Sequence, residues 1–77
     1  MNDRGYYMIK KIKINDEYIR LGQALKLGGL VSSGVEAKFV IQGGEVTVNS
    51  KTELQRGKKL HIGDIVSYNG ETIQISQ

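Results

Sequence analysis

Cysteine, tryptophan and long apolar runs are absent from this sequence of 77 residues. Without cysteine there is neither a disulfide framework nor a thiolate metal site, so a reducing cytosol is the expected setting. No apolar segment approaches the roughly 18 residues that a membrane helix requires, and the N-terminus lacks the apolar core of a signal peptide. We therefore expect a soluble cytoplasmic protein with no membrane partner.

Side chains suited to catalysis or metal binding are also scarce. His61 is the only histidine, and its position between Leu60 and Ile62 is typical of a strand surface rather than of a general base. Asp64 follows Gly63 before an apolar run, where a turn carboxylate that accepts hydrogen bonds from neighbouring amides is expected. The sequence thus predicts no metal, no cofactor, no small-molecule substrate and no enzymatic activity.

Length and charge narrow the class of protein further. A chain this short forms one domain at most, with a small core; residues 1–7 show no periodicity and are expected to be a mobile tail, which leaves residues 8–77 as the domain. The net charge is +3, with cations gathered near residues 10–13, within residues 20–38 and at residues 56–59. Such a charge is compatible with nucleic-acid binding but does not establish it.

Two short helices are predicted in the middle of the chain. The first spans about residues 20–27, with a core-facing stripe at the i, i+3, i+4, i+7 spacing formed by Leu21, Ala24, Leu25 and Gly28. The second opens with the capping box Ser33-Gly34-Val35-Glu36. A glycine pair follows each helix, and helix termination explains these pairs better than a phosphate-binding loop.

The second predicted helix has apolar residues on two sides. Ala37, Val40 and Ile41 form one stripe, and Val35 with Phe39 forms another on nearly the opposite side. This pattern predicts a helix packed on both flanks, with Phe39 in the core. The wedge between the stripes is expected to face solvent, and it carries Lys38 and Gln42.

Alternation of period two predicts strands around this helical region. The expected strands cover residues 9–14, 45–49, 52–54, 60–62, 65–68 and 72–75. Asn69-Gly70 is a strong signal for a type I′ hairpin turn between the last two. The predicted fold class is α+β, with two short helices packed on a small, mostly antiparallel sheet.

Several exposed side chains could meet a polyanion. Lys26 and Lys38 lie on helix faces turned from the core, although a solvated lysine needs no ligand, and residues 55–59 form a basic loop able to contact phosphates. Tyr18 and Tyr68 could stack on unpaired bases, but core or edge packing is the stronger expectation for both.

An ordered set of residues extends from about residue 18 to residue 66. It consists of Leu21, Leu25, Lys26, Leu27, Gly29, Ala37-Lys38, Ile41, Gly44, Val46, Val48-Asn49, the basic segment Arg56-Gly57-Lys58-Lys59-Leu60, and Gly63-Asp64. This set resembles the S4 RNA-binding domain with its αL motif, and more narrowly the small stand-alone bacterial S4-like proteins associated with ribosome maturation.

The resemblance implies a function and a binding surface. In the S4 family the two helices and their turn face RNA, so it implies a monomeric protein that binds structured ribosomal RNA, in large-subunit assembly or on a ribosomal particle. The positions matched to basic RNA contacts are Arg20, Lys26, Lys38, Arg56, Lys58 and Lys59. To these we add Gln42, which shares the face of Lys38, and Lys51 of the following hairpin.

Three positions depart from the family pattern. Gly22 stands where many S4 domains have an acidic residue, Gly34 where they have an arginine, and Ser50 where they favour glycine. We expect the absence of an arginine at position 34 to affect RNA binding more than the fold, and we expect residues 56–59 to compensate for it.

Two other classes of function remain open from the sequence. A protein-interaction module could use an exposed sheet edge without binding RNA directly. A sulfur carrier of the β-grasp type would need Gly-Gly at its C-terminus, whereas this chain ends Ile75-Ser76-Gln77.

Overall fold

The computed structural model describes residues 9–77, so the tail expected at residues 1–7 lies outside the described residues. Two helices and seven strands follow one another along the chain: β1 (Ile9–Lys13), β2 (Ile19–Arg20), α1 (Leu21–Leu27), α2 (Gly34–Gln42), β3 (Val46–Val48), β4 (Lys51–Thr52), β5 (Lys59–Leu60), β6 (Ile65–Tyr68) and β7 (Glu71–Ser76).

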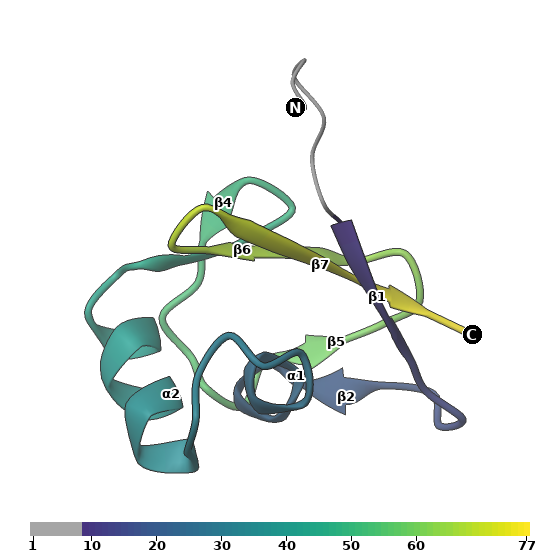
Figure 1. Ribbon diagram of the computed structural model, residues 1–77, viewed down its shortest axis with the longest axis horizontal. Coiled ribbons are helices and arrows are strands. Elements are labelled where there is room, and N and C mark those ends of the chain that lie inside the picture. The colour runs from purple at the N-terminus through teal and green to yellow at the C-terminus, as the bar shows by residue number, and fades with distance from the viewer. Residues whose placement is uncertain (1–8) are drawn as a thin grey trace.

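Five of the strands form one sheet in the order β1-β7-β6-β3-β4. β1 runs parallel to β7, and the three other pairs are antiparallel. Both helices lie on one side of this sheet, with α1 seen nearly end-on below it in Figure 1. The predicted α+β class, with two helices on a mostly antiparallel sheet, is confirmed.

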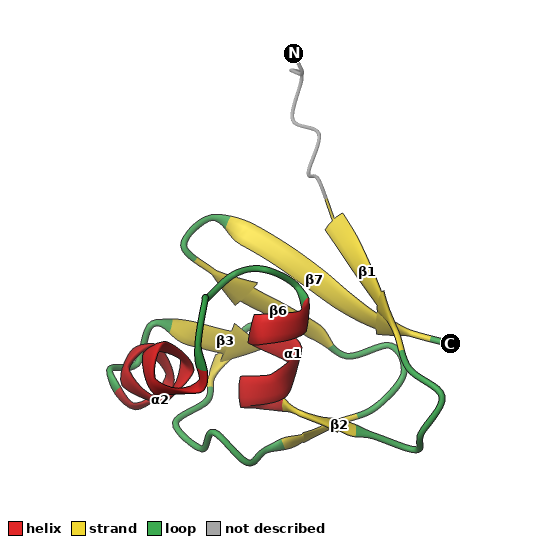
Figure 2. Cartoon of the chain, turned by 60° about the horizontal axis from the view of Figure 1, so that its bottom comes forward, coloured by secondary structure: helices red, strands yellow, loops and turns green. Residues whose placement is uncertain are grey.

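The remaining two strands, β2 and β5, pair with each other in a separate antiparallel ribbon. Figure 2 shows this ribbon running into the start of α1. The sequence alone indicated no strand at Ile19–Arg20, and it predicted a strand that includes His61, whereas His61 follows the end of β5. A two-residue strand carries too little alternation to be recognised, because it exists only through its pairing with a distant segment.

The core lies between the helices and the sheet. Its largest fully buried side chains come from both layers and from the β2–β5 ribbon, and are Leu21, Leu25, Ile41, Val46, Leu60, Val66, Ile73 and Ile75. Fully burying such a side chain contributes roughly 1.5–3 kcal/mol each, which holds helices that are too short to be stable alone.

Two tight turns fix the register of the antiparallel strands. At the predicted hairpin, Asn69 and Gly70 have φ values of 52° and 79°, as a type I′ turn requires. The turn between β3 and β4 has the same form, since Asn49 and Ser50 have φ values of 51° and 73°. Ser50 therefore holds a left-handed backbone conformation that favours glycine.

The predicted start of α2 is confirmed with one correction. The Ser33 hydroxyl accepts a hydrogen bond from the Glu36 amide at 3.1 Å. The Glu36 carboxylate does not bond back to Ser33; it accepts bonds from the amide and hydroxyl of Ser32, at 2.8 and 2.9 Å. These bonds hold the pKa of Glu36 below its usual range, the backbone amide contributing most.

The predicted packing of α2 on two flanks is wrong. Ala37, Val40 and Ile41 are buried, but Val35 is 65% and Phe39 67% exposed. The sheet and α1 cover a single flank of α2, as Figure 1 shows, and nothing in residues 9–77 covers the other. Phe39 is therefore a surface residue and not part of the core.

Candidate functional site

The β2–β5 ribbon brings the start of α1 against the basic segment. Arg20 lies directly opposite Lys59 in this ribbon. The first amides of α1 have no side-chain cap; the Leu21 amide instead donates to the Lys58 carbonyl at 2.8 Å and the Gly22 amide to the Arg56 carbonyl at 3.0 Å. The basic segment thus satisfies donors that a helix start leaves without partners, and this fixes its cations beside α1.

Three candidate cations surround a shallow hollow of about 510 Å³ at the start of α1, which we call the first hollow. Arg20, Lys26 and Arg56 line it, and all three are exposed. The other lining residues are Gly22, Gln23, Gly34 and Gly57. The structure therefore brings together candidates that are up to 36 positions apart in the chain.

Gly22 makes room for one of these cations. A Cβ atom at position 22 would lie 2.7 Å from the Cγ of Arg56, closer than real Cβ contacts allow. The departure from the family pattern at Gly22 therefore lets the Arg56 side chain lie against α1. Gly34, by contrast, borders open space, with nothing within 4 Å of a Cβ there, so Arg56 and Gly34 share the first hollow without touching.

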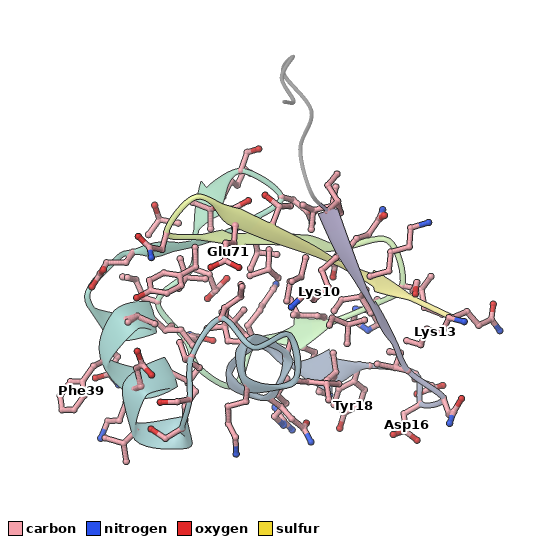
Figure 3. The ribbon with its side chains drawn as sticks, viewed as in Figure 1. Lys10, Lys13, Asp16, Tyr18, Phe39 and Glu71 are labelled. Carbon is pink, nitrogen blue, oxygen red and sulfur yellow. The ribbon has the colours of Figure 1, made fainter. Side chains whose placement is uncertain are left out.

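Tyr18 organises the junction between α1 and the basic segment. The Arg20 guanidinium lies 5.5 Å and the Lys59 ammonium 4.8 Å from the centre of its ring, within the range of cation–π attraction. Arg20 also donates to the Gly57 carbonyl at 2.8 Å. Figure 3 shows Tyr18 beside β2, on the same side of the molecule as α1. Tyr18 thus positions two cations, a role that the amino-acid sequence alone did not indicate.

The other predicted stacking residue, Tyr68, is partly buried and packs against the core. The expected packing, rather than base stacking, is confirmed for this side chain. His61 lies near Tyr18, with 6.3 Å between the ring centres.

A second hollow of about 460 Å³ borders the basic segment at Lys58 and Lys59. Lys51, Lys58 and Lys59 line it, together with Val48, Asn49, Glu53, His61 and Asp64. Since Lys59 lines this hollow and lies opposite Arg20, which lines the first, the two hollows adjoin through the β2–β5 ribbon.

The two carboxylates in the second hollow are engaged by the protein itself. Glu53 accepts a bond from the Gln55 amide at 3.1 Å. Asp64 accepts one from the His61 amide at 2.8 Å and another from the Asn49 side chain at 3.0 Å, as expected for a turn carboxylate. These bonds fix the loops that carry the lysines, so Asn49 and Asp64 have a structural role.

Lys38 and Gln42 lie apart from both hollows. Both are exposed on α2, as predicted, and neither lines a hollow. Taking about 100° per residue, Lys38 is about 40° around the helix from Gly34, and Gly34 does line the first hollow. Lys38, the one cation of α2, therefore lies on the flank of the helix next to that hollow.

Within residues 9–77 no group of three or more histidine, aspartate or glutamate side chains could hold a metal ion. In the same part of the chain, neither helix has the length and apolar character needed to cross a bilayer.

Comparisons with known proteins agree with this architecture. The sequence pattern of the S4 domain matches residues 12–76. The chain is 43% identical over 63 residues to the "Probable ribosome maturation protein RlbA" of Bacillus subtilis (strain 168), covering 82% of this chain and 89% of that protein. It is 34% identical over 58 residues to YbcJ of Escherichia coli (strain K12), covering 75% and 83%.

A solved structure extends the likeness to the whole fold. The solution structure of YbcJ from E. coli, described as revealing an "ALFAL motif involved in RNA-binding", superposes with a TM-score of 0.72 and 29% identity over 100% of this chain and 98% of that one. Fold, sequence pattern and relatives agree: this chain belongs to the S4 domain family.

Proposed function

We propose that this protein binds structured ribosomal RNA through its basic surface, during large-subunit assembly or on a ribosomal particle. The observation that carries the proposal is the convergence of six candidate cations on two adjoining hollows, joined where Arg20 faces Lys59. The names of the relatives, a ribosome maturation protein and a structure with a motif involved in RNA binding, support the same function.

The mechanism follows from the rigidity of the surface. Hydrogen bonds from α1 to the basic segment fix the backbones of Arg56 and Lys58 beside the helix, and the Arg20 side chain is held by its bond to the Gly57 carbonyl. Cations fixed in this way match a particular spacing of phosphates in folded RNA, so they read shape and backbone rather than base sequence. We propose that the contacts are Arg20, Lys26, Lys38, Gln42, Lys51, Arg56, Lys58 and Lys59.

We also propose in what form and in which compartment this domain acts. Residues 8–77 would act as a single S4-like domain, monomeric and cytoplasmic, that binds RNA without catalysing a reaction on it.

Strand addition at a sheet edge has less support as an alternative function. One edge strand, β1, carries Lys10, Lys11 and Lys13, and the other, β4, has only two residues; charged and short edges oppose pairing with another chain.

Salt dependence and charge reversal test the proposal together. If about four of the seven proposed cations engage phosphates directly, log K should fall against log salt with a slope of about −3 to −4, by analogy with duplex DNA. The double variant Lys38→Glu, Lys58→Glu should abolish binding to ribosomal RNA. The matched control Lys11→Glu, Lys13→Glu makes the same change of charge on the exposed edge of β1 and should bind almost as the native protein does.

Two results would contradict the proposal. One is an affinity that does not vary with salt. The other is full binding by the folded Lys38→Glu, Lys58→Glu protein. Cross-linking in cells, followed by sequencing of the attached RNA, would separate ribosomal RNA from other RNA.

A further inference from the structure

Two exposed apolar side chains lie next to each other on the outer side of α2. Val35 and Phe39 are one helical turn apart, with 65% and 67% of their surfaces exposed. Figure 3 shows the Phe39 ring projecting away from the body of the molecule. Phe39 is the only phenylalanine in the chain, and the RNA contacts proposed above do not use it.

This apolar pair lies beside the basic and polar positions of α2. At about 100° per residue, the exposed positions of α2 follow one another around the helix from Gly34, with Lys38 at about 40°, Gln42 at about 80°, Val35 at about 100° and Phe39 at about 140°. Gly34 lines the first hollow. A polyanion lying along this face would therefore meet Lys38 and Gln42 before it reached the apolar pair.

Two acidic side chains, Glu36 and Glu45, lie near this pair. The Glu45 carboxylate comes within 3.3 Å of the point where a Cβ at Gly43 would lie, and Gly43 is about 40° beyond Phe39 around the helix. Glu36 is the neighbour of Val35 and lies about 60° beyond Phe39 around the helix. Its carboxylate accepts two bonds from Ser32, at 2.8 and 2.9 Å, so it faces the start of α2. Both carboxylates thus lie on the side of Phe39 away from the cationic flank, so an anionic partner would approach the pair from the cationic side.

The size of the patch also favours RNA over a second protein. A phenylalanine carries roughly 150–250 Å² of surface, so an exposed Phe39 and Val35 present on the order of 200 Å². A stable protein interface buries about 800 Å² on each partner. One unpaired base, in contrast, needs only a single aromatic face on which to stack.

We propose that Phe39, with Val35 beside it, stacks an unpaired base of the bound RNA while Lys38 and Gln42 hold the adjoining backbone. This inference rests on the proposed function and specifies its ligand, namely structured RNA with a bulged or looped-out nucleotide next to a helix. Because the ring contacts the face of the base and offers no hydrogen bond, the site tolerates any base.

Two RNA hairpins of equal length test the inference. One has a fully paired stem, and the other has a single unpaired nucleotide in the same stem. Phe39→Ala should weaken binding to the bulged hairpin by about 5- to 100-fold, the range expected for one base stacked on an aromatic ring. It should leave binding to the paired hairpin and the salt slope on both hairpins unchanged.

A second variant and a matched control separate stacking from charge. The chain has no tryptophan, so Phe39→Trp introduces one fluorescent reporter, which should retain affinity and be quenched by the bulged hairpin but not by the paired one. Lys38→Ala, in contrast, should weaken binding to both hairpins and make the salt slope shallower by about one. Phe39 is exposed, so all three variants should melt at nearly the native temperature.

Three results would overturn the inference while leaving RNA binding intact. The first is an equal loss on both hairpins in Phe39→Ala, and the second is no loss on either. The third is self-association of the native protein in sedimentation equilibrium that Phe39→Ala abolishes, which would assign the patch to a second copy of the chain. Failure of the native protein to bind either hairpin or ribosomal RNA would instead overturn the proposed function.

Discussion

Arg20 and Lys59 face each other across a ribbon only two residues long, and both lie over the ring of Tyr18. Two like charges held this close repel each other. The electron-rich face of the tyrosine offsets part of that repulsion, and the bond from Arg20 to the Gly57 carbonyl directs the guanidinium toward the first hollow. The pair thereby joins the two hollows into one basic surface.

Replacing the Tyr18 ring should therefore disturb both cations. Tyr18→Leu keeps an apolar side chain but removes the aromatic face, and we expect RNA affinity to fall by about 2- to 5-fold, as for one or two exposed cation–π contacts. Tyr18→Phe keeps the ring and should bind as the native protein does. Fluorescence polarisation with a labelled ribosomal RNA fragment measures both affinities. Equal affinities for the leucine and phenylalanine variants would contradict this role.

A methyl group at position 22 should displace Arg56. Because a Cβ there would lie 2.7 Å from the Arg56 Cγ, we expect Gly22→Ala to lose the contact that Arg56 makes and to make the salt slope shallower by about one. Gly34→Ala is the matched control, since its added Cβ would meet nothing within 4 Å, and its affinity should be unchanged.

A double-mutant cycle tests whether Gly22→Ala acts by displacing Arg56. In the Gly22→Ala background, Arg56→Ala should cost little further affinity, because the arginine is already displaced. If the losses from the two substitutions simply add, Arg56 retains its place and the proposed steric role of Gly22 is wrong.

The turn between β3 and β4 should be stabilised by glycine. Ser50 has a φ of 73°, a conformation that costs an L-residue about 1–2 kcal/mol and glycine almost nothing. Because glycine also loses more conformational entropy on folding, we expect Ser50→Gly to raise the free energy of unfolding by only about 0.5–1 kcal/mol. Urea unfolding measures the change, and Ser50→Ala, which keeps the strained backbone, should show no gain.

Acid should weaken the start of α2 through Glu36. Its pKa is held below the usual range in the folded protein by the Ser32 amide and then by the Ser32 hydroxyl. A lowered folded-state pKa contributes stability that is present above the unfolded-state pKa and is lost as the pH falls through the folded-state pKa. Glu36→Gln should therefore be less stable than the native protein at neutral pH, with the difference shrinking toward zero in acid.

Urea unfolding of the native protein and Glu36→Gln at a series of pH values checks this dependence. Glu17→Gln makes the same change of side chain at an exposed position outside α2 and serves as the control. A constant difference between Glu36→Gln and the native protein across the acid range would contradict the prediction.

Local signals in the sequence determined much of this protein. The hydroxyl of Ser33 caps α2, glycines end both helices, and Asn69-Gly70 closes a hairpin, because each signal acts between residues a few positions apart. Period-two alternation likewise marked most of the strands, and the ordered pattern of residues indicated the S4 domain.

The tertiary structure alone decided three further features. The sequence of α2 carries two apolar stripes, and only the placement of the sheet and α1 determines that Ala37 and Ile41 are buried while Phe39 is exposed. The β2–β5 ribbon and the contact of Arg56 with Gly22 join segments more than 30 positions apart. Such contacts depend on the closure of the whole chain around its core, so periodicity could identify the candidate cations but could not bring them together.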